Sequence, residues 1–294
     1  MVRDGEGVGV PRVRVVSVTF NPGPELEQFA RSLTEATASP YTFVLVDNGA
    51  EHEVVDDVAA RYGAEVLRPG ANLGYGAAAN LGARGGTEPW VVVANPDVIW
   101  RRGSLDALVE AGERLPAAGA LGPQILNTDG TVYPSARAVP SLRQGAGHAL
   151  LSRLWADNPW TRAYRREHEF VEPAEHTVGW LSGACLLLRR AALAPAGGFD
   201  ESYFMFFEDL DLGERLGRAG WHNIYVPSAV VVHDQGASWR ERPSSMIRAH
   251  HRSAEQYLHR RYAAWYLAPL RGAISAGLRV RAWWETRGTT HRAA

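Results

Sequence analysis

Four acidic residues follow five aromatic or sulfur-containing side chains in the stretch YFMFFEDLDLGER, which runs from Tyr203 to Arg215. Apolar rings exclude water, and a carboxylate loses free energy when water is removed from it. Glu208 and Asp209 open a predicted helix, where the helix dipole stabilises negative charge by about 0.3–1 kcal/mol. Desolvation raises the pKa of such a carboxyl group, and the dipole lowers it. The setting suits a general base that takes a hydroxyl proton, with a helix cap as the alternative.

The other two acids of this stretch have a helical pairing pattern. Asp211 and Glu214 precede Arg215 and Arg218 by four residues, so each acid is expected to lie beside an arginine on one face of the helix. We expect both pairs to lie on a solvated face and to have a structural role.

Short β-branched runs alternate with helical stretches in the first third of the chain. Strands are predicted at 13–20, 42–48, 64–69 and 90–97, and helices at 25–37 and 53–62. Continuous apolar strands separated by helices indicate an α/β fold with a mostly parallel sheet covered on both faces. Ligands of such sheets bind beyond the carboxyl ends of the strands. The polar residues at these ends are therefore candidate binding residues: Thr19, Asn21, Asp47, Asn48, Asn95 and Asp97.

Asp97 is a candidate metal ligand. The tripeptide NPD resembles a shortened Asp-x-Asp metal motif with Asn95 in place of the first acid. One carboxylate, completed by substrate phosphates, commonly holds magnesium or manganese. His233, at the end of a predicted strand in SAVVVHD, is a candidate second ligand. A turn at Asp97 and a structural role for the histidine are the alternatives.

The stretch NLGYGAAANLG places Gly74, Gly76 and Ala79 in the G-x-G-x-x-A spacing of dinucleotide-binding sites. That fingerprint follows the first strand of its sheet, whereas this one follows the third predicted strand. We therefore interpret these small residues as points where a helix approaches a nucleotide or the sheet closely. A nicotinamide-dependent oxidoreductase is the alternative.

The boundaries between helices, strands and loops are harder to predict in the rest of the chain. Residues 117–177 have weak periodicity and are expected to contribute to the lining of a cleft, and the stretch NTDGTVYPSARAVPS within them is interpreted as a hairpin and loop. A strand and helix at 178–193, a loop at 197–206, a helix at 208–220 and a strand at 222–234 follow. The predicted divisions are an extended terminus at 1–11, a domain at 12–240 with halves 12–100 and 101–240, and basic amphipathic helices at 241–294.

The last fifty-five residues, from Arg240 to Ala294, contain eleven arginines and three glutamates. Apolar residues recur between them at helical intervals: Ile247, Ala254, Leu258, Tyr262 and Trp265, then Leu267, Leu270, Ile274 and Leu278, with Tyr266, Trp283 and Trp284 nearby. Such helices can pack on the domain, lie in an anionic membrane surface or form a homodimer contact. The pattern leaves these three interpretations open.

Composition excludes several classes of protein. The 294 residues are 46% hydrophobic and 21% charged with a net charge of −1, which excludes a disordered body and gives no case for nucleic acid as a partner. Cys185 is the single cysteine, so no internal disulfide forms, and its apolar neighbours predict a buried thiol. Neither a signal peptide nor an apolar run of 18 residues is found, so we expect a cytoplasmic protein.

Seven stretches between Arg12 and Ser238 resemble, in order and spacing, the family 2 glycosyltransferases of the GT-A fold: VSVTFN, VLVDNG, NLGYGAAANLG, ANPD, WLSGACLLLRR, FFEDLDLGERL and VVVHD. The chain is most similar to the bacterial rhamnosyltransferases among them. The resemblance implies an inverting, metal-dependent enzyme of cell-wall or polysaccharide biosynthesis. It would move L-rhamnose from dTDP-L-rhamnose to a lipid-linked acceptor such as N-acetylglucosaminyl-diphospho-polyprenol, in peripheral contact with the inner face of the cell membrane. A non-catalytic sugar-nucleotide-binding protein is the alternative.

The resemblance also implies residue roles. Asp209 would be the base, with Glu208 beside it, and Asp97 and His233 would hold Mg²⁺ or Mn²⁺. The donor nucleotide would contact Thr19, Asn21, Asp47, Asn48, Gly74, Gly76, Asn80 and Asn95. The sugar and acceptor pocket would be lined by Arg137, Trp180, Leu181, Ser182, Gly183 and Phe207. Arg137, in SARAVPS, matches an arginine-containing loop of these transferases and would lie near a diphosphate, with an exposed loop arginine as the alternative. The aromatic run before Glu208 would position a sugar ring and exclude water. Asn95 departs from the family pattern, since an acid there would give the ion another charged ligand.

Overall fold

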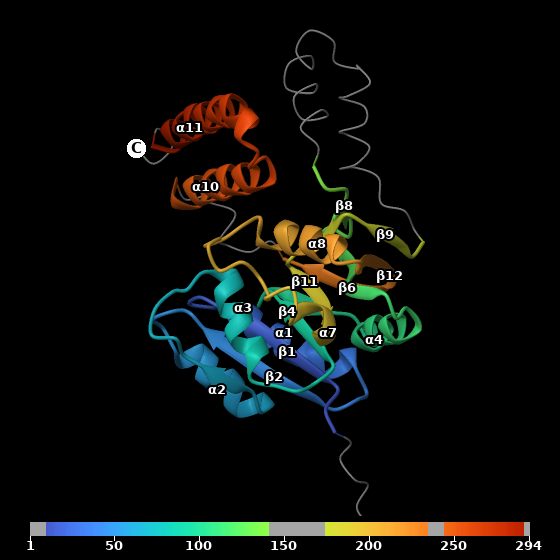
Figure 1. The fold of residues 1–294 in the computed structure, drawn as a ribbon. Coiled ribbons are helices and arrows are strands. Elements are labelled where there is room, and N and C mark those ends of the chain that lie inside the picture. The colour runs from blue at the N-terminus through green and yellow to red at the C-terminus, as the bar shows by residue number, and fades with distance from the viewer. Residues whose placement is uncertain (1–9, 141–173, 235–243, 291–294) are drawn as a thin grey trace, which may run out of the picture.

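A computed structural model describes residues 10–140, 174–234 and 244–290 of the chain (Figure 1), and for 244–245 and 282–290 it describes the backbone alone. The predicted extended terminus therefore lies almost wholly outside the described residues. The same holds for much of the weakly periodic middle segment and for the side chains of Trp283 and Trp284.

The described chain forms three layers, a central sheet with helices on both faces (Figure 1). The strands are β1 (Val13–Thr19), β2 (Tyr41–Asp47), β3 (Glu65–Leu67), β4 (Trp90–Ala94), β5 (Val98–Trp100), β6 (Ala118–Leu126), β7 (Val132–Tyr133), β8 (Ala136–Arg137), β9 (His176–Val178), β10 (Trp180–Leu181), β11 (Cys185–Arg189) and β12 (His222–His233). The helices are α1 (Glu25–Ala36), α2 (Glu53–Tyr62), α3 (Tyr75–Arg84), α4 (Ser104–Arg114), α7 (Arg190–Leu193), α8 (Glu208–Arg218), α10 (Ser244–Arg261), the 3-10 turn η1 (Trp265–Leu267) and α11 (Ala268–Thr290).

The main sheet has the strand order β3-β2-β1-β4-β11-β6-β12-β5. Strands β1 to β4 run parallel to one another, β11 is antiparallel to both β4 and β6, and β12 is parallel to β6. Strands β1, β2, β4, β6 and β12 therefore all end at one edge. The predicted mostly parallel α/β sheet is confirmed, and strands from both predicted halves of the domain belong to it.

Strands β1 and β4 are buried along their whole length because both faces of the sheet are covered there. In β1, Val13 and Val15 belong to a core with α1, α2 and α4. Val16 and Val18 belong to a second core with α3, α7 and α8. Cys185 is buried, as its apolar neighbours predict.

Strand β6 lies between β11 and β12, in a part of the weakly periodic middle segment for which the sequence predicts no strand. Its sequence, AGALGPQIL, contains glycine and proline, which are depleted inside central strands. A Cβ on Gly122 would lie 2.8 Å from the Leu181 side chain, so glycine permits a close approach there. Pro123 pairs with Val226, where the register of β12 shifts, so its missing N–H is tolerated.

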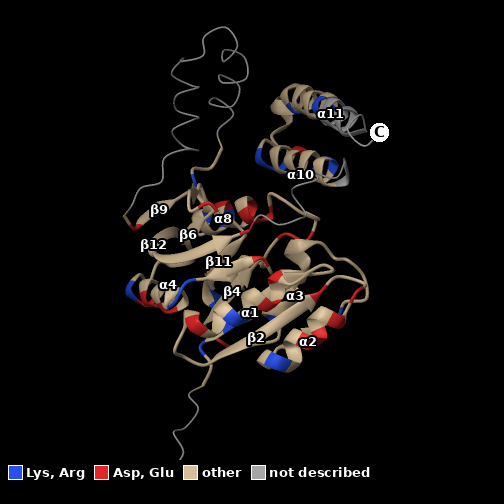
Figure 2. Ribbon diagram, turned by 180° about the vertical axis from the view of Figure 1, so that it is seen from behind, with Lys and Arg blue, Asp and Glu red and all other residues tan. Residues whose placement is uncertain are grey.

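The C-terminal helices α10 and α11 lie side by side and form a hairpin (Figures 1 and 2). Helix α10 packs on the domain: its buried Tyr257 joins Tyr203 and Leu210 in a small third core. The Ser253 hydroxyl donates a 2.8 Å hydrogen bond to the Met205 carbonyl. In the described ranges, no helix combines the length and apolar character needed to cross a membrane.

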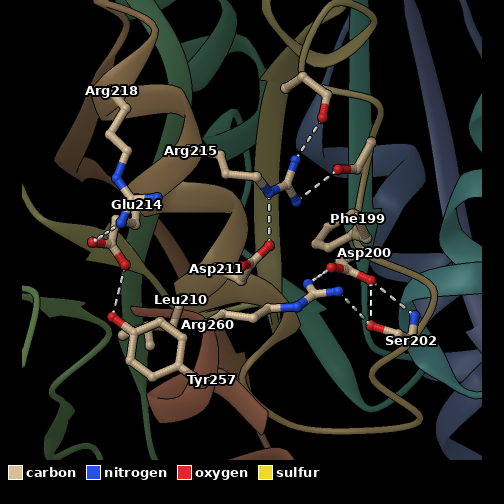
Figure 3. Close-up of polar contacts among 12 residues, drawn as sticks. Phe199, Asp200, Ser202, Leu210, Asp211, Glu214, Arg215, Arg218, Tyr257 and Arg260 are labelled. Carbon is tan, nitrogen blue, oxygen red and sulfur yellow. Dashed lines mark hydrogen bonds and ion pairs between the residues drawn. The ribbon is translucent and has the colours of Figure 1, made fainter. Parts of the chain in front are cut away.

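The acids on the outer side of α8 are contact residues (Figure 3). Asp211 pairs with Arg215, whose guanidinium also donates to the carbonyls of Ala196 and Gly198. Glu214 accepts hydrogen bonds from Tyr257 and Arg218. Because both side chains are only 13% exposed, the expectation of a solvated face is wrong, although both arginine pairs form. These acids tie α8 to the 196–198 segment and to α10.

Candidate active site

Polar side chains gather where the parallel strands end. Thr19 pairs in register with Asp47, so β1 and β2 end level with each other, and both residues are buried. The Thr19 hydroxyl donates to the Val46 carbonyl at 3.4 Å. A ligand at this edge therefore meets two polar side chains that are already fixed by the sheet.

Asp47 is held by groups that sequence reasoning missed. Its Oδ2 atom lies 2.6 Å from His52 Nδ1 and 3.3 Å from Arg68 Nε, and its Oδ1 atom accepts a hydrogen bond from Gly49 N. His52 precedes α2 and Arg68 follows β3, so no short motif connects them with Asp47. The strand order β3-β2-β1 brings these segments together. A prediction of that order from the sequence could have placed His52 and Arg68 beside Asp47.

Two asparagines fix the loops beside this edge. Asn21 has a left-handed φ of 45°, and its Oδ1 atom accepts from the backbone N–H groups of Ala50 and Glu51. Asn48 donates its amide N–H to the Gly74 carbonyl at 3.1 Å. The loops after β1 and β2 and the start of α3 are thereby tied together.

Gly74, Gly76 and Asn80 face the segment that leads to α8. Gly74 has a φ of 81°, and a Cβ there would lie 2.2 Å from the Phe204 carbonyl oxygen. A Cβ on Gly76 meets the Phe199 side chain at 3.0 Å, so these glycines permit contact between two protein segments. The roles of both glycines toward the nucleotide stay predictions.

Asn80 lies behind the site. The side chain is buried, its two amide N–H groups donate to Phe199 O and Glu201 Oε1, and its Oδ1 atom accepts from Phe199 N. Both donors are used by the 199–201 segment, so we correct the prediction of direct nucleotide contact: Asn80 supports the wall of the site.

Asp97 and His233 lie together, as the common direction of β4 and β12 requires. Asp97 Oδ1 is 3.1 Å from His233 Nε2, and the Asn95 amide nitrogen is 3.2 Å from the same Nε2 atom. A protonated ring pairs with Asp97 through its Nε2–H group, whereas a neutral ring with its proton on Nδ1 presents the Nε2 lone pair instead. Asp97 Oδ1 is buried, and in the described residues this histidine nitrogen is its polar contact. With the neutral ring, a carboxylate oxygen and an imidazole lone pair are therefore both available to a cation.

The spacing of this pair fits a divalent ion. Neighbouring ligands of an octahedral ion with ligand distances of about 2.1 Å lie about 3 Å apart. In the described residues no cluster of three or more His, Cys, Asp or Glu side chains forms a metal centre. An ion at Asp97 and His233 would therefore take its remaining ligands from Asn95, from water and from a bound phosphate group.

Glu208 and Asp209 form the first turn of α8, behind two phenylalanines in the left-handed region, Phe206 with φ 68° and Phe207 with φ 70°. Asp209 Oδ2 accepts a hydrogen bond from Gly183 N and its Oδ1 atom accepts one from Leu210 N, both at 2.8 Å. Glu208 is buried, and its Oε2 atom has no hydrogen-bond partner in the described part of the chain. The two neighbouring carboxyl groups therefore have different environments.

These environments decide which group is ionised. Burial, followed by the nearby charge of Asp209, raises the pKa of Glu208 to about 8. Burial also raises the pKa of Asp209, but the bonds from Gly183 and Leu210 and the charge of Arg137 oppose that rise. Backbone N–H groups stabilise a carboxylate, so Asp209 carries the negative charge of the pair and Glu208 holds a proton at neutral pH.

Tyr75, which lies in the NLGYGAAANLG stretch but has no predicted role, links the Asp209 carboxylate to the side of the site where Asp97 and His233 lie. Its hydroxyl donates to the Gly183 carbonyl at 2.7 Å, while the N–H of the same glycine holds Asp209. Burial raises the pKa of Tyr75, and the charges of Glu208, Asp209 and Asp97 raise it further. Asn95 N donates to the Ala184 carbonyl at 2.9 Å. Residues 97 and 209 therefore border one region around Tyr75 and Gly183.

Arg137 and Trp180 lie on the far side of Asp209. They pair in the small β8–β10 sheet, and the guanidinium carbon of Arg137 lies 5.2 Å from the centre of the Trp180 ring. Leu181 is buried under this pair, and Ser182 N donates to the Ser135 carbonyl. The segment from Trp180 to Gly183 therefore runs beside the carboxylate, and its role in binding an acceptor stays a prediction.

The aromatic run before Glu208 is mostly used to hold α10. Tyr203 is fully buried, and the rings of Phe206 and Phe207 both lie 5.4 Å from the His250 ring. Phe204 is the exposed ring of the run. The expectation that the whole run lines a sugar pocket is therefore wrong for Tyr203. For Phe207, which also contacts Tyr257, the pocket assignment stays a prediction.

Comparisons with known proteins agree with this geometry. The profile of a family described as "Glycosyltransferase like family 2" matches residues 11–256. The chain is 49% identical to N-acetylglucosaminyl-diphospho-decaprenol L-rhamnosyltransferase of Mycobacterium tuberculosis over 290 residues, 95% of this chain and 94% of the relative. It is 31% identical to the pre-mycofactocin glycosyltransferase of the same organism over 201 residues, 67% of this chain and 38% of the relative.

Solved structures show the same fold. The crystal structure of GalNAc-T7 with UDP, GalNAc and Mn²⁺ matches with a TM-score of 0.56 at 17% identity, covering 76% of this chain and 43% of the other. The structure of TarS residues 1–349 from S. aureus matches with a TM-score of 0.53 at 14% identity, covering 82% and 65%.

The raised pKa of Glu208 predicts a pH dependence of stability. Between its ordinary value of 4.5 and about 8, the folded state holds a proton that the unfolded state has released. The free energy of unfolding therefore decreases as pH rises through this window. In Glu208→Gln, which has no carboxyl group to titrate, the decrease is expected to be smaller.

Urea denaturation at a series of pH values measures this difference. Glu110→Gln, at an exposed position of α4, is the matched control and should keep the slope of the parent chain. An equal slope in Glu208→Gln and the parent chain would show that Glu208 titrates normally in the folded state.

Proposed function

Because the chain belongs to glycosyltransferase family 2, we propose that it transfers L-rhamnose from dTDP-L-rhamnose to a hydroxyl group of N-acetylglucosaminyl-diphospho-polyprenol. The observation that carries this choice of substrates is the 49% identity over 95% of the chain to a mycobacterial enzyme named for that acceptor and sugar. The family match, residues 11–256, includes the site. Family membership excludes the nicotinamide-dependent oxidoreductase.

Enzymes of this family invert the configuration of the transferred sugar. The acceptor hydroxyl must therefore attack the anomeric carbon from the side opposite to the departing diphosphate. Asp209 suits the base that takes the hydroxyl proton, because it is the ionised member of the carboxyl pair and backbone N–H groups fix both of its oxygens. Each oxygen keeps a lone pair for the acceptor. Glu208, which holds its proton, does not compete for this role.

Asp97 and His233 suit the diphosphate side of the sugar. When bound between them, Mg²⁺ or Mn²⁺ would neutralise negative charge that develops on the leaving diphosphate. Thr19, Asp47 and Asn48 lie at neighbouring strand ends and suit the base and ribose of the donor. The positive charge of Arg137 is close enough to Asp209 to oppose the rise in the pKa of that carboxyl group. Because the acceptor hydroxyl binds at Asp209, this position favours a contact of Arg137 with the acceptor over one with the donor.

The acceptor implies contact with a membrane. A polyprenol chain keeps its diphosphate and sugar at the membrane surface, so the site must reach the cytoplasmic face. The proposal therefore includes peripheral membrane association. A non-catalytic sugar-nucleotide-binding protein would bind the donor but release no dTDP in the presence of any acceptor, and this measurement separates the two functions.

Replacement of the base tests the mechanism. Asp209→Asn is expected to lower the rate of dTDP release with donor and acceptor by about 10²–10⁴-fold. Binding of dTDP by calorimetry and the midpoint of thermal unfolding should change little. Asp211→Asn, two residues away on α8, is the control: it loses the pair with Arg215 and should unfold earlier yet retain transfer. Joint loss of transfer, dTDP binding and stability in Asp209→Asn would support the helix-cap role.

Tyr75 is expected to position the base. Tyr75→Phe removes the hydrogen bond to the Gly183 carbonyl, so the N–H bond that holds Asp209 is weakened. We expect kcat to fall roughly tenfold with an unchanged dissociation constant for the donor. The acidic limb of the kcat profile should move to higher pH, because that N–H bond lowers the pKa of Asp209. Tyr62→Phe loses a comparable bond to Glu27 and should change neither quantity. An unshifted profile in Tyr75→Phe would exclude the positioning role.

Removal of the metal tests the ion site. Excess chelator is expected to stop turnover, and added Mg²⁺ or Mn²⁺ should restore it. His233→Ala and Asp97→Asn should each raise the Mn²⁺ concentration needed for half-maximal binding in the presence of dTDP, followed by electron paramagnetic resonance. Full turnover in excess chelator would contradict the assignment.

A further inference from the structure

Helix α11 has apolar residues on two sides. Ile274 and Leu278 are partly buried on either side of the buried Ser275, whose hydroxyl lies 2.8 Å from His259 Nε2 of α10. The exposed residues from 268 to 277 are all small or apolar: Ala268, Pro269, Leu270, Gly272, Ala273, Ala276 and Gly277. A helix face that meets water normally carries polar side chains. The outward side of α11 therefore has the composition of a contact surface.

Large exposed side chains extend this surface at both ends. Trp265 is 85% exposed and Tyr266 is 66% exposed at the turn between α10 and α11, and Val280 is 63% exposed on α11. We call the surface formed by Trp265, Tyr266, Leu270, Ala273 and Val280 the outer face of the hairpin. Tryptophan and tyrosine are common where an apolar layer meets water, because one part of each ring is apolar and another is polar.

The same hairpin is strongly basic (Figure 2). From Met246 to Arg281 it contains seven arginines and one acid, Glu255, which already pairs with Arg279. Arg248 and Arg252 are exposed on α10, and Arg279 and Arg281 are exposed on α11 beside Val280. Positive charge of this kind attracts an anionic surface by about 1 kcal/mol for each arginine near it.

We propose that the outer face of the hairpin lies in the headgroup region of an anionic membrane, with α11 in the plane of the membrane. The charge decides between occupants: a second copy of the chain would bring two arginine-rich hairpins together, whereas anionic lipid neutralises them. Because no described helix can span a bilayer, binding in the plane is the mode that the hairpin supports. The proposal thus names the membrane-facing element and the lipid chemistry that it binds.

The hairpin is joined to the catalytic turn, and this step rests on the proposed function. Arg260 pairs with Asp200, and Tyr257 donates to Glu214 on α8 (Figure 3). Ser253 holds the Met205 carbonyl four residues before Asp209. A membrane bound to α11 therefore has a fixed relation to the base, as an enzyme that acts on a lipid-linked sugar needs.

Vesicle binding by the full chain tests the proposal. The chain should co-sediment with vesicles of phosphatidylcholine and phosphatidylglycerol, bind vesicles of phosphatidylcholine alone at least tenfold more weakly, and dissociate from the mixed vesicles as salt is added. Val280→Glu should weaken binding to the mixed vesicles roughly tenfold. Val54→Glu, at an exposed valine of α2, is the matched control and should bind as the parent chain does. Equal binding to both vesicle types, or none to either, would overturn the proposal.

Two further measurements separate the remaining outcomes. Sedimentation velocity should show the same oligomeric state for the parent chain and Val280→Glu. A dimer that this substitution dissociates would instead assign the outer face to a second copy. Val280→Glu should retain full turnover with a short, water-soluble acceptor and lose it with an acceptor embedded in vesicles. If the parent chain transferred sugar to neither acceptor but still bound anionic vesicles, the proposed function would be wrong, and the assignment of the outer face to a membrane would be retained.

Discussion

The backbone of Gly183 constrains the whole site. Its N–H holds the Asp209 carboxylate and its carbonyl accepts the Tyr75 hydroxyl, while the next residue, Ala184, accepts from Asn95 N. Three elements distant in sequence, α3, α8 and the end of β4, therefore meet at one short segment. The separation between the carboxylate and the Asp97–His233 pair follows from these bonds. Since the segment continues directly into β11, the sheet holds the Asp209 carboxylate and the Tyr75 hydroxyl in place.

The direction of the strands explains why much of the site can be predicted from the sequence. Apolar runs followed by Thr19, Asp47 and Asp97 need only the rule that parallel strands end at one edge. His233 joins them because β12 runs the same way as β4, which its position at the end of an apolar run does suggest. Glu208 and Asp209 are indicated by their unusual place behind aromatic rings.

The parts that sequence reasoning missed depend on contacts between distant segments. Strand β6 contains glycine and proline, and the contacts that tolerate them come from the neighbouring strands and from the Leu181 side chain. Tyr75 has no recognisable partner until Gly183 is folded against it. Asp211 and Glu214 have helical spacing that is equally suited to a solvated face, and only the packing of α10 and the 196–198 segment reveals them as contact residues. Local sequence patterns predict individual helices and strands. They carry little information on which face of a helix or strand another segment of the chain will cover.

The left-handed conformations of Phe206 and Phe207 determine how much of the chain is needed to hold the turn before Asp209. Left-handed geometry costs a non-glycine residue about 1–2 kcal/mol, and two such residues in succession persist only when their surroundings hold them. Their rings rest on His250 and Tyr257, so the offsetting contacts come from α10. A shortened chain ending at β12 would retain its sheet and the Asp97–His233 pair, yet the strained turn would be free to relax and carry Asp209 away from Gly183. The smallest fragment that keeps this turn in place therefore extends at least through α10.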